Sequence, residues 1–132
     1  MNSYDRLRGV RILAVDDDKD TREMLRFILE QQAATVVAVK SVTEAVDSVQ
    51  QSPPDLILSD IAMPDYNGYA LISLVRANDK KVGRLTPAIA LTAYTSPADE
   101  ETALAAGFQR YMSKPFEPAE LIDAICGLVS KG

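Results

Sequence analysis

Acidic side chains follow two of the short apolar runs in this sequence, and a hydroxyl and an ammonium group follow two others. Three aspartates occupy positions 16–18, after the first run, and Asp60 follows the third run. Thr92 ends the fourth run and Lys114 comes after the fifth. Carboxylates, a hydroxyl donor and a cation are the groups that a metal-assisted transfer of a phosphoryl group requires.

The chemistry open to these side chains is specific. Attack on phosphorus by the carboxylate of Asp60 would give an acyl phosphate. Carboxylates at 16, 17 and 60 repel one another at close range, so they cannot all stay ionised without a compensating cation. A small cavity lined only by oxygen ligands suits octahedral Mg²⁺. Mg²⁺ and Lys114 would neutralise charge on the transferring group, and Thr92 would donate a hydrogen bond to it.

Composition excludes several other classes of protein. The 132 residues suffice for one domain, and 47% apolar with 25% charged residues excludes a disordered chain. The sequence has no histidine, which excludes histidine-dependent catalysis, histidine-dependent zinc sites and a phosphohistidine on this chain. A net charge of −5 argues against direct binding of nucleic acid. The single cysteine, Cys126, and the lack of an apolar run near the roughly 20 residues of a membrane span favour a cytoplasmic protein without membrane insertion.

Short apolar runs alternate with segments of helical periodicity along the chain. The pattern predicts strands over residues 10–15, 35–39, 55–59, 88–91 and 109–113. It predicts helices that end near 32, begin at Ser41, span 69–76, run from Ser96 to Gly107 and begin at Pro118. In the third helix Leu71, Leu74 and Val75 are expected to point inward, and the polar stretch 78–87 is expected to be the longest loop.

Five strands that alternate with five helices indicate a parallel sheet with right-handed crossovers and helices on both faces. In open parallel sheets, ligands bind outside the carboxyl ends of the strands. The aspartates at 16–18, Asp60, Thr92 and Lys114 each stand at such an end. The four separate segments are therefore expected to bring their side chains to one rim of the sheet.

Four motifs together resemble the receiver domain of two-component response regulators. They are LAVDDD at 13–18, DLILSDIAMP at 55–64 with NG at 67–68, LTA at 91–93 and YMSKPF at 111–116. Each motif alone is weak, but all four stand in order at the correct spacing, and the resemblance covers about the whole chain. It implies an α/β, flavodoxin-like, doubly wound fold with a five-stranded parallel sheet in the order 2-1-3-4-5 and five helices. Residues 1–132 would form a single receiver domain, with 1–9 as an N-terminal lead-in.

The resemblance also implies a role for each residue that matches the family's motifs. Asp16 and Asp17 match the acidic pair that holds Mg²⁺. Asp60 matches the phosphoacceptor and would also be a metal ligand. Ala62 matches the position whose backbone carbonyl binds the metal.

Further matches concern the later motifs. Thr92 matches the switch hydroxyl, and Lys114 matches the lysine of the site. Pro115 matches the residue joined to that lysine, usually through a cis peptide bond. Tyr111 matches the aromatic switch residue that turns inward on phosphorylation. Tyr94 stands two residues after Thr92, and we expect its bulk to hinder water and lengthen the lifetime of the acyl phosphate.

The family's partners follow from the same resemblance. Its members take a phosphoryl group from a histidine on a kinase or phosphotransfer protein, and later hydrolyse it, without being enzymes in the usual sense. The donor is expected to dock near the first helix, where Asp18, Lys19 and Arg22 border the site. The fourth helix, fifth strand and fifth helix, about residues 98–131, would change packing and bind a downstream protein or a second copy. Parts of the sequence resemble receiver domains of hybrid sensor histidine kinases, so the chain could be stand-alone or excised.

Other interpretations stay open at this point. The chain could be a degenerate receiver-like module that binds a partner without phosphorylation, although such modules usually lose an acid or the lysine. An aspartate-nucleophile phosphatase is disfavoured because Ala62 stands where the general acid would be. Asp18 could be a helix cap or a metal ligand, with the cap favoured by its position before a helix.

Overall fold

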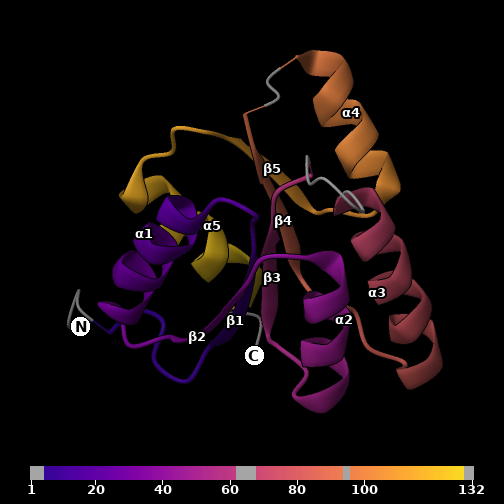
Figure 1. Ribbon diagram of the computed structural model, residues 1–132, viewed down its shortest axis with the longest axis horizontal. Coiled ribbons are helices and arrows are strands. Elements are labelled where there is room, and N and C mark those ends of the chain that lie inside the picture. Colours follow the sequence, from indigo (N-terminus) through magenta and orange to yellow (C-terminus); the bar gives the residue numbers. More distant parts are fainter. Residues whose placement is uncertain (1–4, 62–67, 94–95, 130–132) are drawn as a thin grey trace.

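The structure is a computed structural model, and it describes residues 5–61, 68–93 and 96–129. Strands and helices alternate along the chain (Figure 1). The strands are β1 (Arg11–Val15), β2 (Thr35–Val39), β3 (Leu56–Ser59), β4 (Ala88–Thr92) and β5 (Arg110–Ser113). The helices are α1 (Lys19–Glu30), α2 (Val42–Gln51), α3 (Gly68–Val82), α4 (Pro97–Ala106) and α5 (Pro118–Val129).

All five strands are parallel and lie in the order β2-β1-β3-β4-β5, which confirms the predicted topology. β1 and β3 are central, and every residue of β3 and β4 is buried. Their apolar runs lack a polar alternation because both faces of these strands are covered. β2 and β5 are the edge strands and are more exposed.

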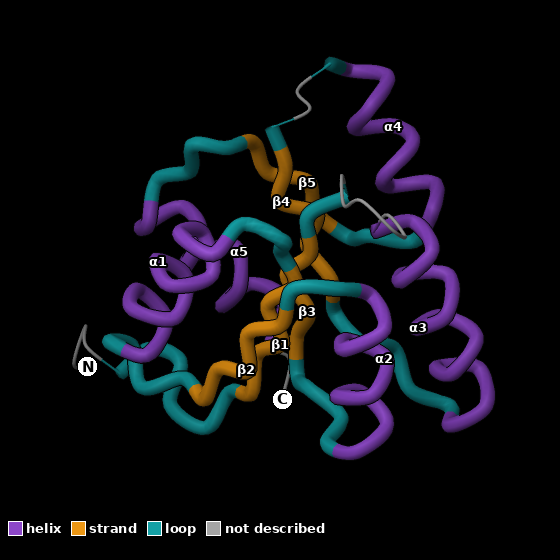
Figure 2. Tube along the Cα trace, in the orientation of Figure 1, coloured by secondary structure: helices purple, strands orange, loops and turns teal. Residues whose placement is uncertain are grey.

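Two helical layers enclose the sheet, as Figure 2 shows. α1 and α5 cover one face, where Leu25, Leu29, Leu121 and Ile125 pack with alternate residues of the strands. α2, α3 and α4 contribute to the core on the other face. Successive side chains along a strand therefore point into two separate cores, one under each helical layer.

Side-chain caps begin three of the helices where the sequence predicts them. The Asp18 carboxylate accepts from the Thr21 backbone N–H at 3.0 Å, and the Ser41 hydroxyl accepts from Glu44 N at 3.2 Å. Ser96 accepts from Asp99 N at 3.1 Å, directly before Pro97 at the first helical position. Each cap satisfies one of the N–H groups that a helix start leaves without a partner.

The third helix is longer than predicted. α3 continues to Val82, so half of the predicted loop 78–87 is helical, and the connection to β4 is short. The polar residue Asp79 is buried, because its carboxylate accepts from Arg76 at 2.7 Å and from the backbone and hydroxyl of Thr86 at 3.0 and 2.8 Å. Two of the polar residues that suggested a loop, Asp79 and Thr86, therefore belong to a buried hydrogen-bond network, and the others lie on the exposed side of the helix end and connection.

The prediction that Leu74 points into the core is wrong. Leu71 and Val75 are buried, but the side chain of Leu74 is 52% exposed. Leu74 lines a shallow hollow between α2 and α3 with Val46 and Val49, so it lies at the margin of the helix interface.

Among the described residues, no helix is long and apolar enough to cross a membrane.

Truncation of Leu71 and of Leu74 to alanine should show that a core residue and a residue at the margin of the same helix contribute differently to stability. Leu71→Ala should lower the free energy of unfolding by about 2–5 kcal/mol, because it leaves a cavity beside β3 and β4. Leu74→Ala should cost less than about 1 kcal/mol, because half of this side chain already contacts water. Urea denaturation measures both values. Equal losses would contradict the placement of Leu74 at the margin.

Candidate functional site

The carboxyl ends of β1 and β3 hold two aspartates side by side. The Asp16 backbone N–H donates to Val39 O at 3.1 Å, and the Asp60 N–H donates to Val15 O at 2.9 Å. Each aspartate therefore follows directly on a ladder hydrogen bond and has little backbone freedom. The parallel register of the three strands is what brings residues 44 positions apart to one edge.

Three carboxylates converge at this edge. Asp16, Asp17 and Asp60 each offer an oxygen, and these oxygens all lie within 4.8 Å of one another. The side chains of Asp16 and Asp60 are buried, whereas Asp17 is exposed. Buried like charges at this separation require a nearby cation.

Lys114 supplies a cation from the far side of the site. Its Nζ donates to Asp16 Oδ2 at 2.7 Å and to Asp60 Oδ2 at 3.0 Å. The Lys114 backbone N–H donates to Thr92 O at 2.8 Å, which fixes the lysine to the end of β4. The Lys114–Pro115 peptide bond is cis, as the resemblance implies.

Burial and ion pairing act in opposite directions on these groups. Burial raises the pKa of Asp16, and the hydrogen bonds from Lys114 and from the Asp18 backbone only partly oppose this effect. For Lys114, burial lowers the pKa, but hydrogen bonds to Asp16 and Asp60 outweigh it, so the pKa is raised. The ammonium form of Lys114 is therefore the form that the two carboxylates stabilise.

Asp18 acts as a helix cap, and it is not among the three acids whose oxygens converge. Its carboxylate accepts from Thr21 N and, at 2.6 Å, from Thr21 Oγ1, and these two bonds lower its pKa. Its backbone N–H donates to Asp16 Oδ1 at 2.9 Å. Both carboxylate oxygens of Asp16 therefore have protein donors, one from Asp18 and one from Lys114.

Two further residues shape the site in ways that the motifs did not indicate. Arg22 donates from Nη1 to the Asp16 backbone carbonyl at 2.8 Å, so it braces the turn after β1 from within α1. At Gly68 a Cβ atom would lie 2.6 Å from Asp60 O and 2.8 Å from Ile61 Cα. Only glycine permits α3 to start this close to the backbone of Asp60.

The remaining predicted site residues lie on β4 and β5 or outside the described residues. Thr92 is fully buried at the end of β4, next to the Lys114 backbone. Tyr111 lies on β5 and packs against the core under α3 and α4. Ala62 and Tyr94 lie outside the described residues, as does most of the segment after Asp60.

The donor set fits a hard divalent cation. It contains only carboxylate oxygens, with two acids held by the protein and a third, Asp17, open to solvent. Mg²⁺ prefers such oxygen ligands and retains several waters, which an exposed side of the site allows. Softer metals favour thiolate or imidazole ligands, and this sequence contains no histidine.

A fold of this topology with this acidic edge defines a class of signalling protein. Residues 12–126 match the family model of the response regulator receiver domain. The chain belongs to this family, whose members are the signalling phosphoacceptors of two-component systems and bind Mg²⁺ at an acidic aspartate cluster. They interact with histidine kinases or histidine phosphotransfer proteins.

Related sequences differ in overall size. The chain is 47% identical over 116 residues to a 14.6 kDa protein in the sodA1 3′ region of Leptolyngbya boryana, covering 88% of this chain and 87% of that one. It is 35% identical over 112 residues to the DNA-binding response regulator MtrA of Mycolicibacterium paratuberculosis, covering 85% of this chain. The match spans only 48% of MtrA. A match to hybrid signal transduction histidine kinase D of Dictyostelium discoideum, at 34% identity, covers 95% of this chain and 8% of that protein.

Solved structures support the same assignment. The Vibrio cholerae chemotaxis protein CheY4 superposes with a TM-score of 0.83 at 29% identity, covering 90% of this chain and 98% of that one. The non-phosphorylated receiver domain of Leptospira biflexa HemR gives a TM-score of 0.82 at 27% identity, covering 94% and 97%. These matches extend over nearly the whole of both receiver structures.

Replacement of Lys114 should reveal how far the two buried carboxylates depend on it. Lys114→Met should lower the free energy of unfolding by about 1–3 kcal/mol, because it removes two hydrogen bonds to charged acceptors. Addition of Asp16→Asn should recover part of this loss, because only one buried carboxylate then remains. Urea denaturation in metal-free buffer measures both. A Lys114→Met protein as stable as the wild type would contradict the pairing.

Proposed function

We propose that this chain acts as one receiver domain that accepts a phosphoryl group from a phosphohistidine onto Asp60. The observation that carries the proposal is the cluster of Asp16, Asp17 and Asp60 with Lys114 bound to two of them. An acid pair, a phosphoacceptor and a lysine are all present, which distinguishes the chain from modules that have lost the chemistry. The reaction would take place in the cytoplasm.

Transfer of the phosphoryl group needs only the phosphohistidine donor, the Asp60 carboxylate and a proton from water. A carboxylate oxygen of Asp60 attacks the phosphorus of the donor and forms an O–P bond. The P–N bond to the donor imidazole breaks, and its electron pair stays on that nitrogen, which takes up a proton from solvent water. Hydrolysis later returns the carboxylate and inorganic phosphate.

Asp16, Asp17 and Asp60, with the backbone carbonyl of Ala62, would hold Mg²⁺. When bound, Mg²⁺ offsets the negative charge that gathers on the phosphoryl oxygens and the carboxylates. The Lys114 ammonium already contacts Asp60, so after phosphorylation it would donate a hydrogen bond to an oxygen of the phosphoryl group on Asp60. The Thr92 hydroxyl would donate to another oxygen of the group.

The donor is expected to approach over α1, whose outer face carries two large exposed apolar side chains. Met24 is 52% exposed and Phe27 is 64% exposed, one and two turns beyond the helix start that borders the site. Exposed apolar side chains next to polar ones are typical of protein contact surfaces. Arg22 borders the acids through its hydrogen bond to the Asp16 backbone carbonyl, and Lys19 begins the same helix, so both would add positive charge near the anionic phosphoryl group.

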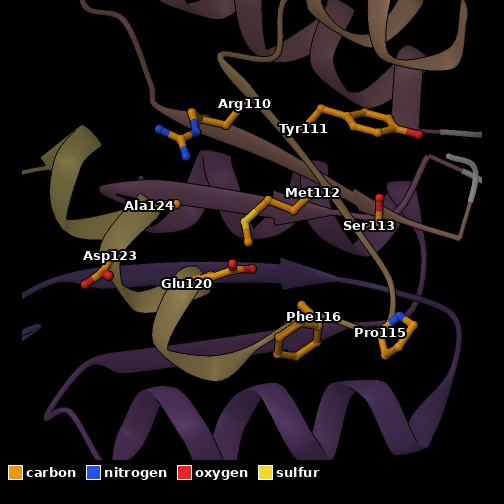
Figure 3. A pocket seen from close by; sticks show the side chains of 9 residues that line it. All are labelled: Arg110, Tyr111, Met112, Ser113, Pro115, Phe116, Glu120, Asp123 and Ala124. Carbon is orange, nitrogen blue, oxygen red and sulfur yellow. The ribbon is translucent and has the colours of Figure 1, made fainter. Parts of the chain in front are cut away.

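Phosphorylation is proposed to alter the face formed by α4, β5 and α5. Figure 3 shows the β5 side of this face, with a hollow of about 610 Å³ beside β5 and α5. Met112 packs toward one core and Tyr111 toward the other, so β5 connects both layers. The Tyr111 hydroxyl is buried without a hydrogen-bond partner among the described residues, so a change of its position costs no hydrogen bond. A downstream protein or a second copy of the chain would read the altered face.

Incubation with acetyl phosphate and Mg²⁺ tests the proposal. Intact-mass measurement should show the gain of one phosphoryl group, because a small acyl phosphate can replace the histidine donor at an open site. Asp60→Asn and treatment with EDTA should each abolish the gain. Asp20→Asn, which removes an exposed acid of α1 outside the cluster, should leave it unchanged.

Failure of acetyl phosphate alone would call for a panel of phosphorylated histidine phosphotransfer proteins. A folded wild-type chain that takes no phosphoryl group from any of them would overturn the proposal. The chain would then be better described as an interaction module that acts without phosphorylation.

A change at Phe27 should separate donor docking from phosphoryl chemistry. For any histidine donor that phosphorylates the wild type, Phe27→Ala should slow transfer at least about fivefold, since the loss of a central aromatic contact of about 1 kcal/mol corresponds to that factor. Phosphorylation by acetyl phosphate should stay at the wild-type rate, because Phe27 does not contact the acids. The matched control is Leu85→Ala, because Leu85 is likewise a large exposed apolar residue, 61% exposed, and lies between α3 and β4 rather than on α1. Equal transfer rates for Phe27→Ala and wild type would remove Phe27 from the docking surface.

A further inference from the structure

α4 is attached to the rest of the fold mainly at its C-terminal end. Within Pro97–Ala106 the buried residue is Ala103, in the second half of the helix, and the next buried side chain is Phe108, just beyond it. The first turn carries Asp99 and Glu100, and it is largely exposed. In Figure 1, α4 stands beyond the carboxyl edge of the sheet, with its later turns against α3.

A single arginine holds this end of α4. Arg76, on α3, donates from Nε at 3.1 Å and from Nη2 at 2.7 Å to the carbonyl of Gly107. Gly107 is the C-cap of α4, so the guanidinium binds the residue that ends the helix. Two donors on one carbonyl fix both the distance and the orientation of the contact.

Gly107 fits this contact for steric reasons as well. Its φ of 128° lies where L side chains are strained. A Cβ atom there would lie 3.2 Å from Arg76 Cγ and 3.3 Å from Ile72 Cγ1, which is a tight contact that both neighbours would have to relieve by a small shift. The chain thus has glycine where the end of α4 lies against Arg76 and Ile72 of α3.

The arginine is itself held from two further sides. Its Nη1 donates to Asp79 Oδ2 and to Thr86 O, both at 2.7 Å, and the Asp79 carboxylate is anchored by Thr86. Nη2 also approaches Gln109 Oε1 at 3.4 Å, which accepts from Ala88 N at 2.7 Å. The end of α4 is therefore tied to the first residues of β4 and β5, away from the phosphoacceptor edge.

From this geometry we propose that Arg76 is a positioning residue of the switch, which makes Gly107 the fixed pivot of α4. The inference rests on the proposed function of Asp60. Thr92 ends β4 at the site, and the chain from there leads to the loosely held first turn of α4. A displacement that begins at Thr92 then rotates the start of α4 while Arg76 keeps its end in place.

Amide hydrogen exchange along α4 tests the pivot, with Mg²⁺ and beryllofluoride as the probe for the phosphorylated site. In the wild type, the probe should change exchange over residues 97–102 and leave 103–108 unchanged. Arg76→Lys keeps the charge beside Asp79 but cannot place two donors on Gly107. Exchange at 103–108 should rise about tenfold without the probe, and the change caused by the probe should extend into 103–108.

The matched control is Arg84→Lys, at an exposed arginine that donates one hydrogen bond to Pro54 O far from α4. It should exchange like the wild type at 103–108. If Arg76→Lys does not fold, Thr86→Val serves instead, since it removes one donor to Asp79 and should produce a smaller change of the same pattern.

Each outcome supports or overturns the proposal that Gly107 is the pivot of α4. Unchanged exchange at 103–108 in Arg76→Lys overturns it, and so does an equal rise over all helices and strands, which would mean only global destabilisation. A wild type that shows no response to beryllofluoride contradicts the proposed function of Asp60. In that case the exchange at 103–108 without the probe still shows whether Arg76 holds the end of α4.

Discussion

The ion pairs of Lys114 with Asp16 and Asp60 are the constraint on which the site depends. Two buried carboxylates at the ends of adjacent strands would repel each other without a cation between them. The cation comes from the far end of the sequence, so β1, β3 and the end of β5 must reach the same edge. The strand order β2-β1-β3-β4-β5 meets this requirement, because β4 carries Lys114 in position through a backbone hydrogen bond.

A second polar network lies at the opposite end of β4 and β5 from the acidic site. Arg76 and Asp79 tie α3 to the starts of both strands and to the end of α4. Between the two networks, β4 is buried along its whole length, whereas β5 is an edge strand that is only partly buried. Under the proposed function, movement caused by a charge at the site would occur in the parts that neither network holds, such as the start of α4.

Local sequence features were sufficient to predict most of the architecture. Apolar runs at strand length, separated by helical periodicity, indicated five parallel strands because such strands are buried on both faces. Asp18, Ser41 and Ser96 marked helix starts because a cap acts within three residues of itself. The motifs around Asp16, Asp60, Thr92 and Lys114 were found because strand ends of a parallel sheet share one edge.

The sequence by itself determined the order of elements, the family and the residues that gather at the acidic edge, since each depends on patterns only a few residues long. Tertiary structure alone decided the rest. The last turns of α3 are helical because Thr86 and Gly107 provide distant partners for Asp79 and Arg76. Leu74 lies outside the core because α2 and α3 leave an open hollow beside it, at the margin of their interface. The fit of Gly68 against Asp60 appears only when the two backbones meet in space.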